Sequence, residues 1–144
     1  MRAVWPALWI NKFTDHNAWV IAHHEAGHPA HDGLLSKMDV VVLHKAHPAN
    51  IRFAHYAKAA GCTIIYDTDD YDEDAFSEFF TAFHVSNMAD NIEWFRSNAN
   101  GFTVASRPLL DHYDGVMIEN GFDTTLPMFQ AHPESYFHGN HGRH

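Results

Sequence analysis

Two short, unbroken apolar runs on either side of a helical stretch constrain the fold most. Residues 40–43 and 62–66 are rich in β-branched side chains and too short for helices, which is typical of strands covered on both faces. Between them, Pro48 and Gly61 stand where a helix over residues 49–60 would begin and end. A strand, a helix and a strand in this order favour parallel strands that are joined by a crossover helix.

The alternation of strands and helices continues through most of the chain. We expect further strands over residues 4–10, 18–22, 102–105 and 115–118, and helices over residues 32–37, 72–83, 87–98 and 108–113. Ser106 is the expected N-cap of the last helix. The pattern predicts an α/β fold over residues 1–127, a doubly wound, mainly parallel, Rossmann-like sheet with helices on both faces. Residues 128–144 lose this periodicity and are rich in His and Gly, so we expect a tail or surface extension there.

The charge and composition of the chain argue against several classes of partner. The formal net charge is −9 and only 9 of the 144 residues are Lys or Arg, which disfavours nucleic acid and anionic membrane surfaces as ligands. Neither apolar run approaches the roughly 20 residues that cross a bilayer, so we expect no membrane span. Cys62 is the single cysteine and lies in a predicted buried strand. No disulfide framework is therefore expected, and a cytoplasmic location fits this cysteine usage.

Polar side chains gather at the predicted carboxyl ends of the strands. Ligands of an open parallel sheet bind at this edge, and carboxylates there can hold a cation, orient sugar hydroxyls or act as a general base. The expected catalytic residues are Asp67, Asp69, Asp70 and His44. The expected substrate-binding residues are Lys45, Ser106, Asn120, Gly121 and Asp123. The alternative is that Asp69 and Asp70 only cap the helix that follows them.

A second candidate site is the string His24-Glu25-Ala26-Gly27-His28, which has the H-E-x-x-H spacing of zinc peptidases. That chemistry needs both histidines on one face of a continuous helix, with the glutamate as general base. Gly27 is unfavourable inside a helix, and Pro29 disfavours helical geometry at His28. We therefore expect an exposed loop and no dedicated metal site, with His24 and His28 as candidate metal ligands under the lesser alternative, a zinc peptidase.

Four segments, taken in order, resemble the N-terminal half of GT-B glycosyltransferases. They are D-V-V-V-L-H-K-A from Asp39, G-C-T-I-I-Y-D-T-D-D from Gly61, N-I-E-W-F-R-S-N-A-N-G-F-T-V-A-S-R-P-L-L-D-H-Y from Asn91 and G-V-M-I-E-N-G-F-D from Gly115. The resemblance implies a Rossmann-like, acceptor-side domain whose edge residues face a cleft. In such an enzyme, His44 or one of the carboxylates would deprotonate the acceptor hydroxyl.

The resemblance also implies what else the reaction would need. GT-B enzymes bind the nucleotide-sugar donor with a second domain, and few residues follow Asp123 in this sequence. We therefore expect a domain that does not transfer a sugar alone and has no cofactor of its own. A nucleotide-sugar would enter only if a separate protein or a second copy supplied the other domain, and the acceptor would be a glycan. The alternative is a non-catalytic binding or structural module that keeps the fold and docks a partner, or another copy of itself, at the sheet edge.

Overall fold

The computed structural model describes residues 4–21, 32–71 and 88–119 of the 144-residue chain. The chain divides into two compact units, one of Met1–Ala18 with Asn120–His144 and one of Trp19–Glu119. The predicted boundary between a domain over residues 1–127 and a tail lies outside the described residues and stays a prediction. Among the described residues, no helix is both long and apolar enough to cross a membrane.

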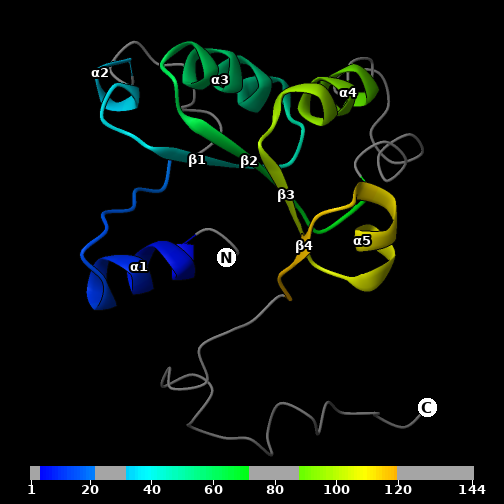
Figure 1. Cartoon of the computed structure of the whole chain (residues 1–144), viewed down its shortest axis with the longest axis horizontal. Helices are drawn as coiled ribbons and strands as arrows, with labels where there is room; N and C mark the ends of the chain where they lie inside the picture. The colour runs from blue at the N-terminus through cyan, green and yellow to red at the C-terminus, as the bar shows by residue number, and fades with distance from the viewer. Residues whose placement is uncertain (1–3, 22–31, 72–87, 120–144) are drawn as a thin grey trace, which may run out of the picture. The chain divides into compact units, whose positions relative to one another are not determined.

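The Trp19–Glu119 unit is built on a parallel sheet of four strands in the order β1-β2-β3-β4. Figure 1 shows these strands with helices packed against them. The strands are β1 (Val40–His44), β2 (Thr63–Thr68), β3 (Gly101–Val104) and β4 (Val116–Met117). The described helices of this unit are α2 (Asp32–Leu35), α3 (Pro48–Ala59), α4 (Met88–Asn98) and α5 (Arg107–Tyr113). The predicted fold class, an α/β Rossmann-like domain on a parallel sheet, is confirmed.

Helix α3 begins and ends where the sequence places its signals. Pro48 stands at the first helical position, and the ring of His47 accepts a hydrogen bond from the backbone N–H of Ala49 at 3.1 Å. After the helix, Gly61 adopts a φ of +85°, a left-handed conformation that glycine takes without a steric penalty. The chain then turns directly into β2, which pairs with β1 along its length.

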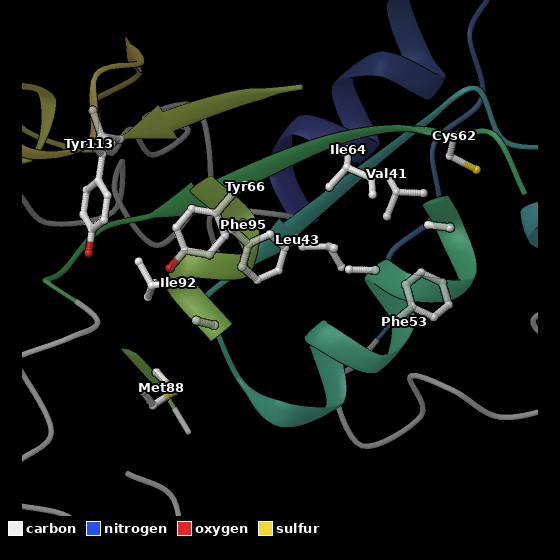
Figure 2. Packing of buried hydrophobic residues seen from close by; sticks show 14 of the residues in the cluster. Val41, Leu43, Phe53, Cys62, Ile64, Tyr66, Met88, Ile92, Phe95 and Tyr113 are labelled. Atoms are coloured by element: carbon white, nitrogen blue, oxygen red, sulfur yellow. The ribbon is translucent and has the colours of Figure 1, made fainter. Parts of the chain in front are cut away.

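The core lies on one face of this sheet. Along β1, Val41 and Leu43 are buried, whereas Val40 and Val42 between them are 52% and 61% exposed. In Figure 2, Tyr66 of β2 lies against Phe95 of α4, with their ring centroids 4.6 Å apart. The cluster also takes buried side chains from the other described helices of the unit, namely Leu35, Phe53 and Tyr113. These helices therefore cover the Val41 face, and a helix on the opposite face stays a prediction.

Two of the predicted strands are wrong, both near the start of the chain. Residues 4–10 belong to α1 (Val4–Phe13), a helix of the other unit. Pro6 falls in the first turn of α1, where a backbone N–H needs no partner. One turn apart, the rings of Trp9 and Phe13 pack with centroids 4.5 Å from each other. An apolar run without alternation does not distinguish a strand from a helix, and here the helical pairing prevails.

The second wrong strand covered residues 18–22, of which 18–21 are described and have no strand structure. At the start of this segment, the side chain of Asn11 forms the hydrogen bonds that a neighbouring strand would otherwise form. Its Oδ1 accepts from the N–H of Ala18 at 2.6 Å, and its Nδ2 donates to the carbonyl of Ala18 at 2.7 Å. Both backbone groups of Ala18 are thus satisfied without a neighbouring strand. The helix predicted over residues 72–83 lies outside the described residues.

Candidate functional site

Three neighbouring strands, β1, β2 and β3, place a histidine, an aspartate and a threonine side by side near their carboxyl ends. His44 of β1 is in register with Asp67 of β2, and Asp67 is in register with Thr103 of β3. Partners in register on a parallel sheet point to the same face, which here is the face opposite the core. Asp67 Oδ2 lies 2.9 Å from His44 Nδ1, and Asp67 Oδ1 accepts from Thr103 Oγ1 at 2.6 Å. One buried carboxylate therefore joins three strands.

The contact with Asp67 determines which nitrogen of His44 can take up a proton. An ionised carboxylate only accepts hydrogen bonds, so the Nδ1 atom of a neutral His44 must carry the hydrogen that lies toward Asp67. The Nε2 atom then holds the lone pair. The His44 side chain is 36% exposed, whereas the Asp67 side chain is buried. This arrangement of an accessible imidazole on a buried aspartate suits a general base.

A lysine and two further aspartates complete the cluster just beyond the strand ends. Lys45 Nζ lies 2.6 Å from Asp69 Oδ1 and also pairs with Asp70 Oδ2. Asp69 Oδ1 is itself buried and meets the lysine at ion-pair distance without the angles of a hydrogen bond. Burial alone would raise the pKa of Asp69, but Lys45 and, more weakly, His44 outweigh it, and the pKa lies below its ordinary value. His44 Nε2 is 3.8 Å from Asp69 Oδ1.

The backbone between β1 and α3 is held by two buried asparagines. Asn50 Nδ2 donates to the carbonyl oxygens of His44 and Lys45, at 2.6 and 2.9 Å. Asn91 Nδ2, from α4, donates to the carbonyl of Ala46 at 2.8 Å. Sequence reasoning missed both residues. The available signal was a polar side chain at a buried position of each helix, because a buried amide must find partners.

The structure brings together five of the predicted site residues: His44, Lys45, Asp67, Asp69 and Asp70. It also shows a local role for the aspartate-rich segment, since Thr68 Oγ1 accepts from the N–H of Asp70 at 3.2 Å and donates to its carbonyl at 2.9 Å. Whether Asp69 and Asp70 cap a following helix lies outside the described residues.

Ser106 is not joined to this cluster by any contact that the structure describes. It stands at the N-cap position of α5 with extended backbone, as predicted, but its side chain forms no capping hydrogen bond. Asn120, Gly121, Asp123, His24 and His28 lie outside the described residues. Within the described part of the chain, no group of three or more His, Cys, Asp or Glu side chains is arranged to hold a metal ion.

Comparison with known protein families, with characterised proteins and with solved structures finds no match for this chain. The fold and the site nevertheless define a class of arrangement: a parallel α/β sheet with a His–Asp pair near the carboxyl ends of its strands. In sheets of this kind ligands bind outside those ends, so the position of His44 and Asp67 agrees with a ligand site.

Proposed function

We propose that this chain is an acceptor-side, glycosyltransferase-like domain in which His44 removes the proton from an acceptor hydroxyl. The observation that carries the proposal is the contact between His44 Nδ1 and the buried Asp67, which leaves Nε2 with its lone pair at the carboxyl edge of the sheet. The order of the segments that resemble the N-terminal half of GT-B enzymes supports the same function.

The proposed step is a proton transfer coupled to substitution at the anomeric carbon of a donor sugar. The acceptor O–H gives its proton to His44 Nε2, the oxygen bonds to the anomeric carbon, and the bond from that carbon to the nucleotide diphosphate breaks. The resulting imidazolium is stabilised by Asp67 at 2.9 Å and by Asp69 at 3.8 Å. A positioned base of this kind contributes roughly 10²–10⁴-fold to rate.

The charges around His44 favour an uncharged acceptor. Among the residues that the structure describes, three carboxylates, those of Asp67, Asp69 and Asp70, stand around the ammonium group of Lys45, which pairs with two of them. The cluster therefore carries excess negative charge and would repel an anionic acceptor. A neutral sugar, whose hydroxyls donate to carboxylates, fits this environment. The diphosphate of a nucleotide-sugar would have to be bound outside this cluster of carboxylates.

The test is a titration of the full chain with a panel of neutral mono- and disaccharides, followed by NMR of the histidine ring protons. We expect at least one sugar to shift the His44 resonance, identified with His44→Gln, and to leave exposed His16 unmoved. Sugar-dependent shifts at His44 that are absent from His16 would support an acceptor site. If no sugar in the panel perturbs His44 at millimolar concentration, the proposed function is wrong.

The alternative function is a non-catalytic structural or binding module. It is favoured by the hydrogen bonds and ion pairs that the residues of the cluster form with one another. Asp67 binds His44 and Thr103, and Lys45 binds Asp69 and Asp70, so the network can hold the strand ends together without any ligand. A purely structural network would leave His44 insensitive to every sugar while His44→Gln lowered the free energy of unfolding. The same titration, with denaturation of the variant, therefore separates the two functions.

A further inference from the structure

We propose that Thr103 is a positioning residue: by orienting Asp67, it favours the form of neutral His44 that carries its hydrogen on Nδ1. Its importance for a reaction rests on the proposed function, but the effect on the imidazole follows from the geometry alone. Thr103 lies on a third strand and is not in the pair that would handle the proton. It acts by fixing the rotation of the Asp67 carboxylate, which lies between Thr103 and His44.

The position of the threonine hydroxyl is well determined. Thr103 is paired in register with Asp67, and β-branched side chains have restricted rotation about the first bond. Its Oγ1 lies 2.6 Å from Asp67 Oδ1, a short distance that is usual for a hydroxyl donating to an ionised carboxylate. Because Oδ1 is held on the β3 side, Oδ2 is presented to β1, where His44 Nδ1 lies 2.9 Å away.

The His44 imidazole has two carboxylates near its nitrogens, Asp67 and Asp69. The rotation of Asp67 therefore affects which ring nitrogen carries the hydrogen. With its hydrogen on Nδ1, the ring donates to Asp67. With its hydrogen on Nε2, the ring would point it toward Asp69 Oδ1, which is 3.8 Å away. Only the first form leaves Nε2 able to accept a proton from a substrate. The nearby Lys45 ammonium neutralises Asp69 at 2.6 Å and so weakens the competing form.

Removal of the Thr103 hydroxyl takes away the hydrogen bond that orients Asp67 Oδ1, and so weakens the hold of the carboxylate on His44 Nδ1. We expect Thr103→Val, which keeps the shape of the side chain, to lower the ratio of Nδ1–H to Nε2–H forms of His44 by roughly five- to tenfold, the effect of one lost hydrogen bond. Thr103→Ser, which keeps the hydroxyl, should restore the ratio of the parent chain.

The measurement is the pair of ring nitrogen-15 shifts of His44, recorded on the full chain at a pH where the ring is neutral. Dominant Nδ1–H in the parent and in Thr103→Ser, together with a clear loss in Thr103→Val, would support the proposal. An unchanged ratio in Thr103→Val would overturn it. This readout does not depend on sugar binding, so a chain that binds no sugar but shows the shift would contradict the proposed function and leave this inference standing.

A second variant keeps the proposal testable if Thr103→Val fails to fold. Thr103→Ala also removes the hydroxyl that donates to Asp67 Oδ1, and it places no additional methyl group beside the carboxylate. If Thr103 positions Asp67 as proposed, the ratio of Nδ1–H to Nε2–H forms of His44 falls in Thr103→Ala by the amount expected for Thr103→Val. A ratio in Thr103→Ala that equals that of the parent chain would overturn the proposal.

Discussion

Asn50 holds Lys45 in a left-handed backbone conformation by donating to the carbonyl oxygens of His44 and of Lys45 itself. Lys45 has a φ of 72°, a conformation that costs a non-glycine residue roughly 1–2 kcal/mol. Its backbone N–H also donates to the carbonyl of Asp67 at 3.0 Å. The chain therefore leaves β1 along a strained path that brings the Lys45 ammonium to Asp69.

Asn50→Ala should destabilise the fold, because it removes the donor shared by two carbonyl groups at a buried position. Loss of partners for buried polar groups costs roughly 1–3 kcal/mol, and we expect the free energy of unfolding to fall by that amount. Urea denaturation of the full chain measures it. The matched control is Asn17→Ala, since Asn17 is exposed. Equal stability of the two variants would contradict the role assigned to Asn50.

Lys45→Gly should be more stable than Lys45→Ala. Both variants lose the ion pairs with Asp69 and Asp70, so that loss cancels in the comparison. Glycine adopts a φ of 72° without strain, whereas alanine retains the penalty. We expect a difference of about 1 kcal/mol in the free energy of unfolding in favour of glycine. A more stable alanine variant would mean that the left-handed conformation is not kept.

The decrease in the free energy of unfolding at acid pH should depend in part on Asp69. Its pKa is lower in the folded chain than its ordinary value of 3.8, so the ionised form stabilises the fold at neutral pH. That contribution is complete above pH 3.8 and is lost as the pH falls through the lower, folded-state pKa. Because Asp69 is partly exposed, solvent screening limits the effect to less than about 1 kcal/mol.

Denaturation of the parent chain and of Asp69→Asn at neutral and at acid pH tests this expectation. The variant should lose less stability on acidification than the parent does. Asp111→Asn is the control, because Asp111 pairs with Arg107 on the exposed surface of α5 at 3.5 Å. An identical pH profile for the parent and Asp69→Asn would be incompatible with a lowered pKa at Asp69.

Gly115→Ala should be destabilising where Gly33→Ala is not. A Cβ atom at Gly115 would lie 2.5 Å from the carbonyl oxygen of Phe102 and 2.8 Å from its Cβ, so the backbone of β3 or of the turn would have to shift. Such overpacking typically costs about 1–3 kcal/mol. A Cβ at Gly33 in α2 would meet nothing within 4 Å, and alanine there should be neutral or gain up to about 1 kcal/mol. Thermal unfolding of both variants and of the parent chain measures these effects. A Gly115→Ala variant as stable as Gly33→Ala would contradict the prediction.

The sequence predicted the elements whose local signals agree with their burial. Strands β1 and β2 have β-branched runs, and α3 is bounded by Pro48 and Gly61. These elements could be predicted because residues close together in the sequence determine them. The prediction of a strand over residues 4–10 is wrong because an apolar run without alternation fits a strand and a helix equally well, and the local signal for the helix is Pro6 in its first turn.

The candidate site was predicted as a set of strand-end residues but without its internal geometry. His44, Lys45 and the aspartates lie at or just beyond the carboxyl ends of their strands, where ligands of a parallel sheet bind, so their meeting could be predicted from the sequence. The role of Thr103 depends on the register of β3 against β2, which is set by packing between distant segments. The Asn91 contact with Ala46 likewise joins residues 45 positions apart, and no local pattern encodes it.

Asp67→Asn should leave the fold largely intact and reverse the state of His44. Asparagine has nearly the same shape, but one of its two terminal groups donates instead of accepting. Thr103 Oγ1 donates to the Oδ1 position, so the amide nitrogen would take the Oδ2 position facing His44 Nδ1. The imidazole could then accept at Nδ1 only by moving its hydrogen to Nε2, which abolishes its use as a base at that atom.

Nitrogen-15 shifts of the His44 ring in Asp67→Asn measure this reversal, and urea denaturation measures the accompanying change in stability. We expect Nε2–H to become the major neutral form, with a loss of no more than about 3 kcal/mol in the free energy of unfolding. Asp111→Asn, far along the chain on α5, should leave the His44 shifts unchanged. A His44 ring that still carries its hydrogen on Nδ1 in Asp67→Asn would mean that the carboxylate does not choose the protonated nitrogen, and the assignment of His44 as the base would lose its structural support.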